Sequence, residues 1–123
     1  MTKNILIVDD SATMRKIIMR GLRQAGIEHA DFKEAGDGVE GMKAVEANTF
    51  DLILSDVNMP NMNGLDFVKA VTAKMPTPPP IVMITTEGSE EIVKEAISRG
   101  AKGYLRKPFT LEKIQEVIGP FLK

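Results

Sequence analysis

The chain has 123 residues, a net charge of −1 and 43% apolar residues, which favours one domain over residues 1–123 with its own core and no output domain. The near-neutral charge gives no basic field for nucleic acid, and the absence of cysteine excludes disulfides and thiolate chemistry. No apolar stretch could span a membrane and no room remains for a signal peptide, so we expect a cytoplasmic protein.

The N-terminal half begins with an apolar run at residues 5–8, which predicts a first strand. Ser11 can then cap a helix that Gly26 ends. The apolar residues of this helix are Met14, Ile17, Ile18, Leu22 and Ala25. A weaker second strand is expected over residues 32–35. Asp37 can cap a second helix, whose apolar residues are Val39, Met42 and Val45.

The C-terminal half continues the alternation, with strands predicted over residues 52–55, 81–85 and, more briefly, 103–105. A helix after the third strand carries Leu65, Val68 and Val71. A helix after the fourth strand carries Ile92, Val93, Ala96 and Ile97. Thr110 can cap a last helix with Leu111, Ile114, Val117, Ile118 and Phe121.

Five strand–helix units with short loops predict an α/β protein, a doubly wound parallel sheet with helices on both faces. The first, third and fourth strands are nearly continuous apolar runs, as buried central strands are, whereas charge interrupts the second and fifth. The order 2-1-3-4-5 satisfies both facts and keeps the crossovers right-handed. In this order the winding reverses between strands one and three, and ligands bind beyond the carboxyl ends of the strands at such a point.

Three carboxylates are expected at that point. Asp9 and Asp10 follow the first strand directly, and Asp56 follows the third. At about 5 Å and an effective dielectric of about 20, each pair would repel by about 3 kcal/mol. A divalent cation would relieve this repulsion, and Mg²⁺ prefers such hard oxygen ligands and shares its shell with phosphate oxygens. Mn²⁺ could take the same ligands.

Each acid also has a simpler interpretation. Asp9 and Asp10 could be an ordinary loop pair that caps the first helix, although Ser11 can do this. Asp56 could be a third metal ligand, or a nucleophile that forms an aspartyl phosphate, or merely a turn residue after a strand. The convergence of the three acids on one edge favours a functional site.

Two further residues reach the same edge of the predicted sheet. Thr85 ends the fourth strand, and Lys107 follows the fifth. A hydroxyl and an ammonium there can bind a phosphoryl group, and three carboxylates, one Mg²⁺ and one ammonium sum to zero charge. Taken alone, each would be an ordinary strand-end or surface residue. A cis Lys107–Pro108 bond would help the lysine to point inward.

Separated motifs along the whole chain resemble the receiver domain of two-component response regulators. They are ILIVDDS at residues 5–11, DLILSDVNMPNMNG at 51–64, ITTE at 84–87 and GYLRKPF at 103–109. The resemblance implies a flavodoxin-like (βα)5 fold and a phosphoacceptor at Asp56, charged by a CheA-like histidine kinase or a small phosphodonor. Asp9, Asp10 and Asp56 would hold Mg²⁺ together with the backbone carbonyl of Asn58.

The resemblance also assigns the residues around the acceptor. Thr85 and Lys107 would bind the phosphoryl group, and Thr85 and Tyr104 would act as the switch pair. The side chains of Asn58 and Glu87 would flank the path of an attacking water and tune dephosphorylation. The chain would then be a signalling switch that catalyses only its own phosphorylation and dephosphorylation.

Among receivers, the chain is most similar to the stand-alone chemotaxis regulators of the CheY group. This implies a downstream partner, such as the flagellar motor switch, that recognises the face of the fourth helix, fifth strand and fifth helix. It also implies a possible phosphatase. Thr86 departs from the pattern, because many chemotaxis regulators have alanine there. A bulkier β-branched residue would change how the loop after the fourth strand moves.

Other functions remain open at this point. A phosphorelay intermediate or a regulator of another kinase would use the same chemistry with a different partner. An aspartyl-phosphate phosphatase of the haloacid-dehalogenase type needs an acid two residues after its nucleophile, where this chain has Asn58. A flavin binder of similar architecture would cradle a phosphate in its first loop, and Asp9 and Asp10 would repel one.

Overall fold

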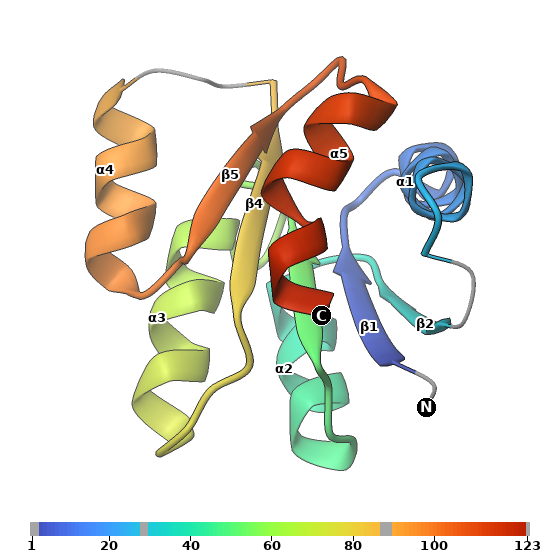
Figure 1. Ribbon diagram of the computed structural model, residues 1–123. Coiled ribbons are helices and arrows are strands. Elements are labelled where there is room, and N and C mark those ends of the chain that lie inside the picture. The colour runs from blue at the N-terminus through green and yellow to red at the C-terminus, as the bar shows by residue number, and fades with distance from the viewer. Residues whose placement is uncertain (1–2, 28–29, 87–89, 123) are drawn as a thin grey trace.

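A five-stranded parallel sheet forms the centre of the computed structural model, which describes residues 3–27, 30–86 and 90–122 (Figure 1). The strands are β1 (Lys3–Val8), β2 (Ala30–Ala35), β3 (Leu52–Ser55), β4 (Ile81–Thr85) and β5 (Gly103–Arg106). Their order is β2-β1-β3-β4-β5, which confirms the predicted topology. β1 and β2 each begin two residues earlier than predicted, and β5 is one residue longer.

The helices lie on both faces of the sheet (Figure 1). They are α1 (Ala12–Gln24), α2 (Gly38–Ala47), α3 (Gly64–Lys74), α4 (Glu90–Arg99) and α5 (Leu111–Val117), followed by a short 3₁₀ turn, η1 (Gly119–Leu122). One core cluster joins α1 and α5 to the sheet through residues such as Leu22 and Ile114. The other joins α2, α3 and α4 to the opposite face through residues such as Val45, Phe67 and Ala96.

The predicted helix caps are present. Ser11, Asp37 and Thr110 each precede a helix and accept a hydrogen bond from the backbone N–H three residues on, at 3.1, 2.8 and 3.1 Å. Such a bond satisfies one of the N–H groups that the first helical turn leaves unpaired. These caps fix where each helix begins relative to the preceding strand, and so place the loops at the carboxyl edge of the sheet.

Some residues expected in the core are exposed. Ile17, Val39, Ile97 and Leu111 are 47%, 39%, 45% and 42% exposed. A helix on a sheet buries only a stripe of its surface, and helical spacing alone does not say which edge of the stripe reaches solvent. The last helix is also shorter than predicted, since Phe121 lies in η1. Pro120 explains this, because proline has no N–H to continue the helix.

None of the helices in the described parts of the chain combines the length and the apolar character that a membrane crossing needs.

Candidate functional site

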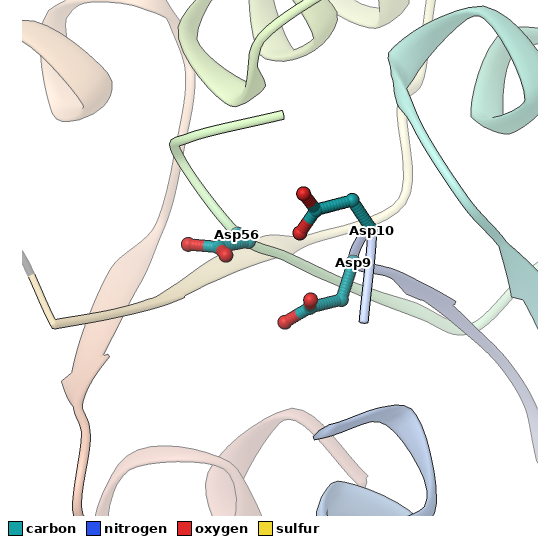
Figure 2. Close-up of side chains that lie close together, drawn as sticks. All are labelled: Asp9, Asp10 and Asp56. Atoms are coloured by element: carbon teal, nitrogen blue, oxygen red, sulfur yellow. The ribbon is translucent and has the colours of Figure 1, made fainter. Parts of the chain in front are cut away.

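The carboxyl ends of β1 and β3 bring three carboxylates together (Figure 2). Val8 and Ser55 are register partners, so the residues that follow them leave the sheet side by side. One oxygen from each of Asp9, Asp10 and Asp56 lies within 4.8 Å of the others. Asp9 is buried, Asp56 is partly buried and Asp10 is exposed, so the cluster opens to solvent on one side.

Several contacts hold Asp9 in place. Its backbone N–H donates to the Ala35 carbonyl at 3.0 Å, and its Oδ1 accepts from the Ser11 N–H at 2.9 Å. Arg15 Nη1 donates to the Asp9 carbonyl at 2.6 Å, while its Nε bonds Glu34 at 2.9 Å. The role of Arg15 was missed from sequence, although an arginine one turn after a helix cap can reach back toward the strand end.

Lys107 provides the cation of the cluster. Its Nζ donates to Asp9 Oδ2 at 3.0 Å and to Asp56 Oδ2 at 3.4 Å, and its side chain is only 9% exposed. Its backbone N–H donates to the Thr85 carbonyl at 2.9 Å, which extends the sheet by one bond beyond β5. The Lys107–Pro108 peptide is cis, as the sequence suggested. The lysine therefore points into the edge of the sheet, as predicted.

The surroundings of Asp56 act against its charge. Burial raises the pKa of its carboxyl group most, and the nearby Asp9 carboxylate raises it further. Lys107 and a 2.7 Å hydrogen bond from the Val57 N–H to Oδ1 lower the pKa, but they do not fully compensate. The net pKa of Asp56 lies above its usual value, so ionisation of this carboxyl group costs more than that of an exposed aspartate.

This donor set fits a hard divalent cation. Carboxylate oxygens from three aspartates lie close enough to share an ion, and the Lys107 ammonium faces two of them. Mg²⁺ prefers oxygen ligands of this kind and keeps several waters, for which the exposed side at Asp10 leaves room. The excess negative charge of the three carboxylates favours a bound cation, which would also stabilise the ionised form of Asp56.

The remaining predicted residues take different positions. Thr85 ends β4 and is 1% exposed, and its backbone carbonyl faces Lys107. Tyr104 lies on β5 beside Met83 of β4, and its ring is 40% exposed. Asn58 is exposed in the loop after Asp56. Glu87 lies outside the described residues, while Thr86, just before it, is exposed.

The loop of residues 57–63, here called the acceptor loop, is tied to the start of α2. Asn61 Nδ2 donates to Asp37 Oδ2 at 2.7 Å, and the Gly38 N–H donates to the Met62 carbonyl at 3.1 Å. A Cβ at Gly38 would lie 2.7 Å from that carbonyl oxygen, so the close approach needs glycine. Sequence reasoning found only the capping role of Asp37. Asp-Gly after a strand was the available signal for a contact at this edge.

The comparisons with known proteins agree with this geometry. The family model of the response regulator receiver domain matches residues 5–119. The chemotaxis protein CheY1 of Helicobacter pylori strain J99 is 45% identical over 94% of this chain and 96% of its own length. A CheY homolog of Campylobacter jejuni is 43% identical over 94% of this chain and 92% of its own.

Solved structures of similar proteins share the fold. The chemotaxis regulator CheY4 of Vibrio cholerae has a TM-score of 0.83 and 36% identity, covering 98% of this chain and 99% of that one. A CheX–CheY complex with BeF₃ and Mg²⁺ from Borrelia burgdorferi has a TM-score of 0.88 and 25% identity, covering 98% and 90%. On the family match and these identities, the chain belongs to the response regulator receiver domain family and is closely related to the CheY chemotaxis regulators.

Proposed function

We propose that residues 1–123 form a single-domain response regulator that accepts a phosphoryl group on Asp56 in the presence of Mg²⁺. The observation that supports this most is the position of the Asp56 carboxylate, which lies within reach of Lys107 and of two further acids. Burial and the Asp9 carboxylate raise the pKa of Asp56, which costs stability and is unexpected for a purely structural aspartate. A nucleophile that works with a metal needs further acids as metal ligands and a cation to bind the incoming phosphoryl group.

Asp9, Asp10, Asp56 and the backbone carbonyl of Asn58 would hold the Mg²⁺ ion, and Mn²⁺ suits the same oxygen ligands. When bound, the metal supplies positive charge that neutralises the carboxylates and the oxygens of the incoming phosphoryl group. Arg15 and the Ser11 N–H keep Asp9 in its orientation. The buried position of Asp9 then gives the site one fixed acid and one exposed acid, Asp10.

The chemical step is a transfer from a phosphohistidine or a small phosphodonor. A carboxylate oxygen of Asp56 forms a bond with phosphorus while the bond from phosphorus to the donor atom breaks. In phosphohistidine or phosphoramidate that atom is a nitrogen, which keeps the electron pair and takes up a proton from solvent, whereas in acetyl phosphate it is an oxygen, which leaves as acetate. Lys107, already 3.4 Å from Asp56, would pair with an oxygen of the transferred group, and the Thr85 hydroxyl would bond another.

The conformational switch would couple a movement of Thr85 to a rotation of the Tyr104 side chain. As Thr85 moves toward the phosphoryl group, it leaves space beneath Tyr104, whose ring now stands 40% exposed. The present void there is only about 10 Å³, bounded by Thr85 and by α4 residues such as Ile92 and Ala96. That holds about one water molecule and not a phenol ring. Inward rotation of Tyr104 would therefore use the space that Thr85 vacates together with a shift of α4, which would change the face of α4, β5 and α5.

The names of the relatives support a chemotaxis pathway for this switch. We propose a CheA-like histidine kinase as the phosphodonor and a protein such as the flagellar motor switch as the receiver of the signal. The CheX–CheY complex of Borrelia burgdorferi shows that a similar protein binds a further protein. We propose a phosphatase as a second kind of partner here, and Asn58 and Glu87 would set the rate of dephosphorylation. The protein would turn over no other substrate.

The test of this function is phosphorylation by acetyl phosphate or phosphoramidate, followed by intact-mass measurement. We expect one phosphoryl group per wild-type chain with Mg²⁺, none after chelation of the metal, and none in Asp56→Asn. Asp51→Asn is the matched control, because Asp51 lies at the other end of β3 and should leave labelling unchanged. Labelling of Asp56→Asn, or labelling of the wild type without any divalent ion, would contradict the proposal.

A further inference from the structure

The acceptor loop has few fixed points of its own. Asn58, Pro60, Asn61 and Asn63 are exposed, and Val57 is the one loop residue with a buried side chain. At its ends, the Gly64 N–H donates to the Val57 carbonyl at 2.8 Å, and Met62 bonds back to Pro60 at 2.7 Å. These bonds lie within the loop and its exit, so they do not fix its middle relative to the rest of the molecule.

The middle of the loop is fixed by α2 instead. Asn61 has a positive φ of 66°, a conformation that asparagine tolerates better than most residues, and its amide points to Asp37. Asp37 is 7% exposed and uses both oxygens, one for the Glu40 N–H at 2.8 Å and one for Asn61 at 2.7 Å. At the same end of α2, the Gly38 N–H donates a hydrogen bond to the Met62 carbonyl. These hydrogen bonds to the N-terminal end of α2 thus fix the middle of the loop.

We propose that the Asp37–Asn61 hydrogen bond is a positioning contact for the metal and phosphoacceptor site. It rests on the proposed function, because the Asn58 carbonyl is the expected metal ligand in this loop. Asn61 lies three residues beyond Asn58, and Pro60 between them limits backbone rotation. Holding Asn61 against α2 therefore holds the Asn58 carbonyl relative to Asp56, without either member of the pair touching the ion. Contacts that orient a ligand in this way affect metal affinity by about 10- to 100-fold.

The alternative is that Asp37 only caps α2 and that its charge acts on the metal from a distance. Asn61→Asp separates the two explanations. It adds a negative charge, so distant electrostatics predicts tighter Mg²⁺ binding. It also places a second carboxylate against Asp37, which breaks the contact, so positioning predicts weaker binding. Asn and Asp both tolerate the positive φ, so the backbone can keep its conformation.

The reciprocal exchange restores the contact. In Asp37→Asn, the cap of α2 is kept, since asparagine caps as well as aspartate, and a rotated Asn61 amide can still accept one neutral hydrogen bond from the new side chain. In Asp37→Asn/Asn61→Asp, the donor and acceptor are swapped, the net charge equals that of the wild type, and the bond can form again. Asn63→Asp is the matched control, because it adds the same charge in the same loop at a residue that bonds Asp66 and not Asp37.

The measurement is Mg²⁺ affinity by calorimetry, with the melting temperature of each metal-free variant to show that it is folded. We expect Asn61→Asp to bind Mg²⁺ about tenfold more weakly, Asp37→Asn to lose less affinity, the double variant to recover most of the affinity, and Asn63→Asp to bind no more weakly than wild type. Amide hydrogen exchange of residues 57–63 should rise in Asn61→Asp and return in the double variant.

Two failures are distinguishable. Wild-type protein that binds no Mg²⁺ would remove the proposed function and this inference with it. Wild-type protein that binds Mg²⁺, together with Asn61→Asp that binds at least as tightly, would overturn this inference alone. A double variant that remains as weak as Asn61→Asp would also overturn it, because the restored contact would then have no effect.

Discussion

Asp37 and Asp56 lie at the same edge of the sheet, and their surroundings change their pKa values in opposite directions. The pKa of Asp37 is lowered by the backbone N–H of Glu40 first and then by the Asn61 amide. The pKa of Asp56 is raised by burial, despite the nearby Lys107. Each oxygen of Asp37 accepts a hydrogen bond from an uncharged donor, whereas Asp56 accepts from the Val57 N–H and shares the Lys107 ammonium with Asp9. Asp37 stabilises the fold, and the ionised form of Asp56 costs stability in the metal-free protein.

Because their pKa shifts are opposite, the two acids affect the stability of the fold differently as the pH changes. A lowered pKa means that Asp37 contributes stability above its unfolded pKa of 3.8, and that this contribution is lost as pH falls through the folded value. A raised pKa means the opposite for Asp56, whose ionisation costs stability as pH rises above 3.8. At neutral pH the ionised Asp56 therefore lowers the stability of the metal-free fold, and a bound metal would offset this loss.

The largest expected effect is on the metal. Asp10→Asn removes an exposed ligand that has no hydrogen-bonding role in the described structure, and we expect Mg²⁺ affinity to fall at least tenfold, about 1.4 kcal/mol. Asp31→Asn, an exposed acid on β2 away from the cluster, is the control and should change affinity less than twofold. Calorimetry measures both. Equal effects of the two substitutions would mean that only the overall charge matters.

Removing the charge of the acceptor should stabilise the metal-free protein. In Asp56→Asn, the repulsion from Asp9 disappears, while Lys107 keeps its 3.0 Å bond to Asp9. We expect the melting temperature at pH 7 to rise by about 4 °C. The gain should shrink as pH falls toward 3.8, because wild-type Asp56 is then neutral as well. Thermal melts from pH 4 to 7 measure this, and a lower melting temperature at pH 7 would contradict it.

Removing the well-paired acid should do the reverse. Asp37→Ala loses the cap of α2 and the bond to Asn61, and we expect the melting temperature at pH 7 to fall by about 4 °C. The loss should diminish at low pH, where wild-type Asp37 is itself protonated. Thermal melts extended below pH 3.8 check this, because the pKa of Asp37 lies below that value. No change at pH 7 would show that the two bonds of Asp37 add nothing to the fold.

Removal of a helix cap with one hydrogen bond should change the melting temperature least, and it serves as a reference for the other substitutions. Ser11 caps α1 with one bond to the Met14 N–H at 3.1 Å, and it is exposed. Ser11→Ala should lower the melting temperature by about 2 °C, at the lower end of the range for helix caps. A loss as large as that in Asp37→Ala would mean that capping alone explains the role of Asp37 in stability.

The parts of the molecule that follow from burial and strand ends were predictable. The apolar runs at Ile5–Val8 and Ile81–Thr85 indicated buried strands, and burial of the central strands led to the observed order. Asp9, Asp10 and Asp56 could be placed together because carboxyl ends of parallel strands share one edge. These inferences need only the alternation of elements and the twist-determined handedness of the crossovers.

The parts that depend on loop geometry were not predictable in this way. The reach of Arg15 to the Asp9 carbonyl and of Asn61 to Asp37 depends on backbone angles that no periodicity encodes. The exposure of Ile17 depends on how far α1 is rotated on the sheet. The early end of α5 had a visible cause in Pro120, whose effect the apolar spacing concealed.

The most direct test of the opposed roles of the two acids is a carboxyl-carbon NMR titration of metal-free protein. Asp56 should titrate above the usual aspartate value and Asp37 below it, and saturating Mg²⁺ should bring the Asp56 pKa down while leaving that of Asp37 nearly unchanged. An Asp56 that titrates at or below the usual value without metal, or one that Mg²⁺ does not affect, would contradict this account of the site.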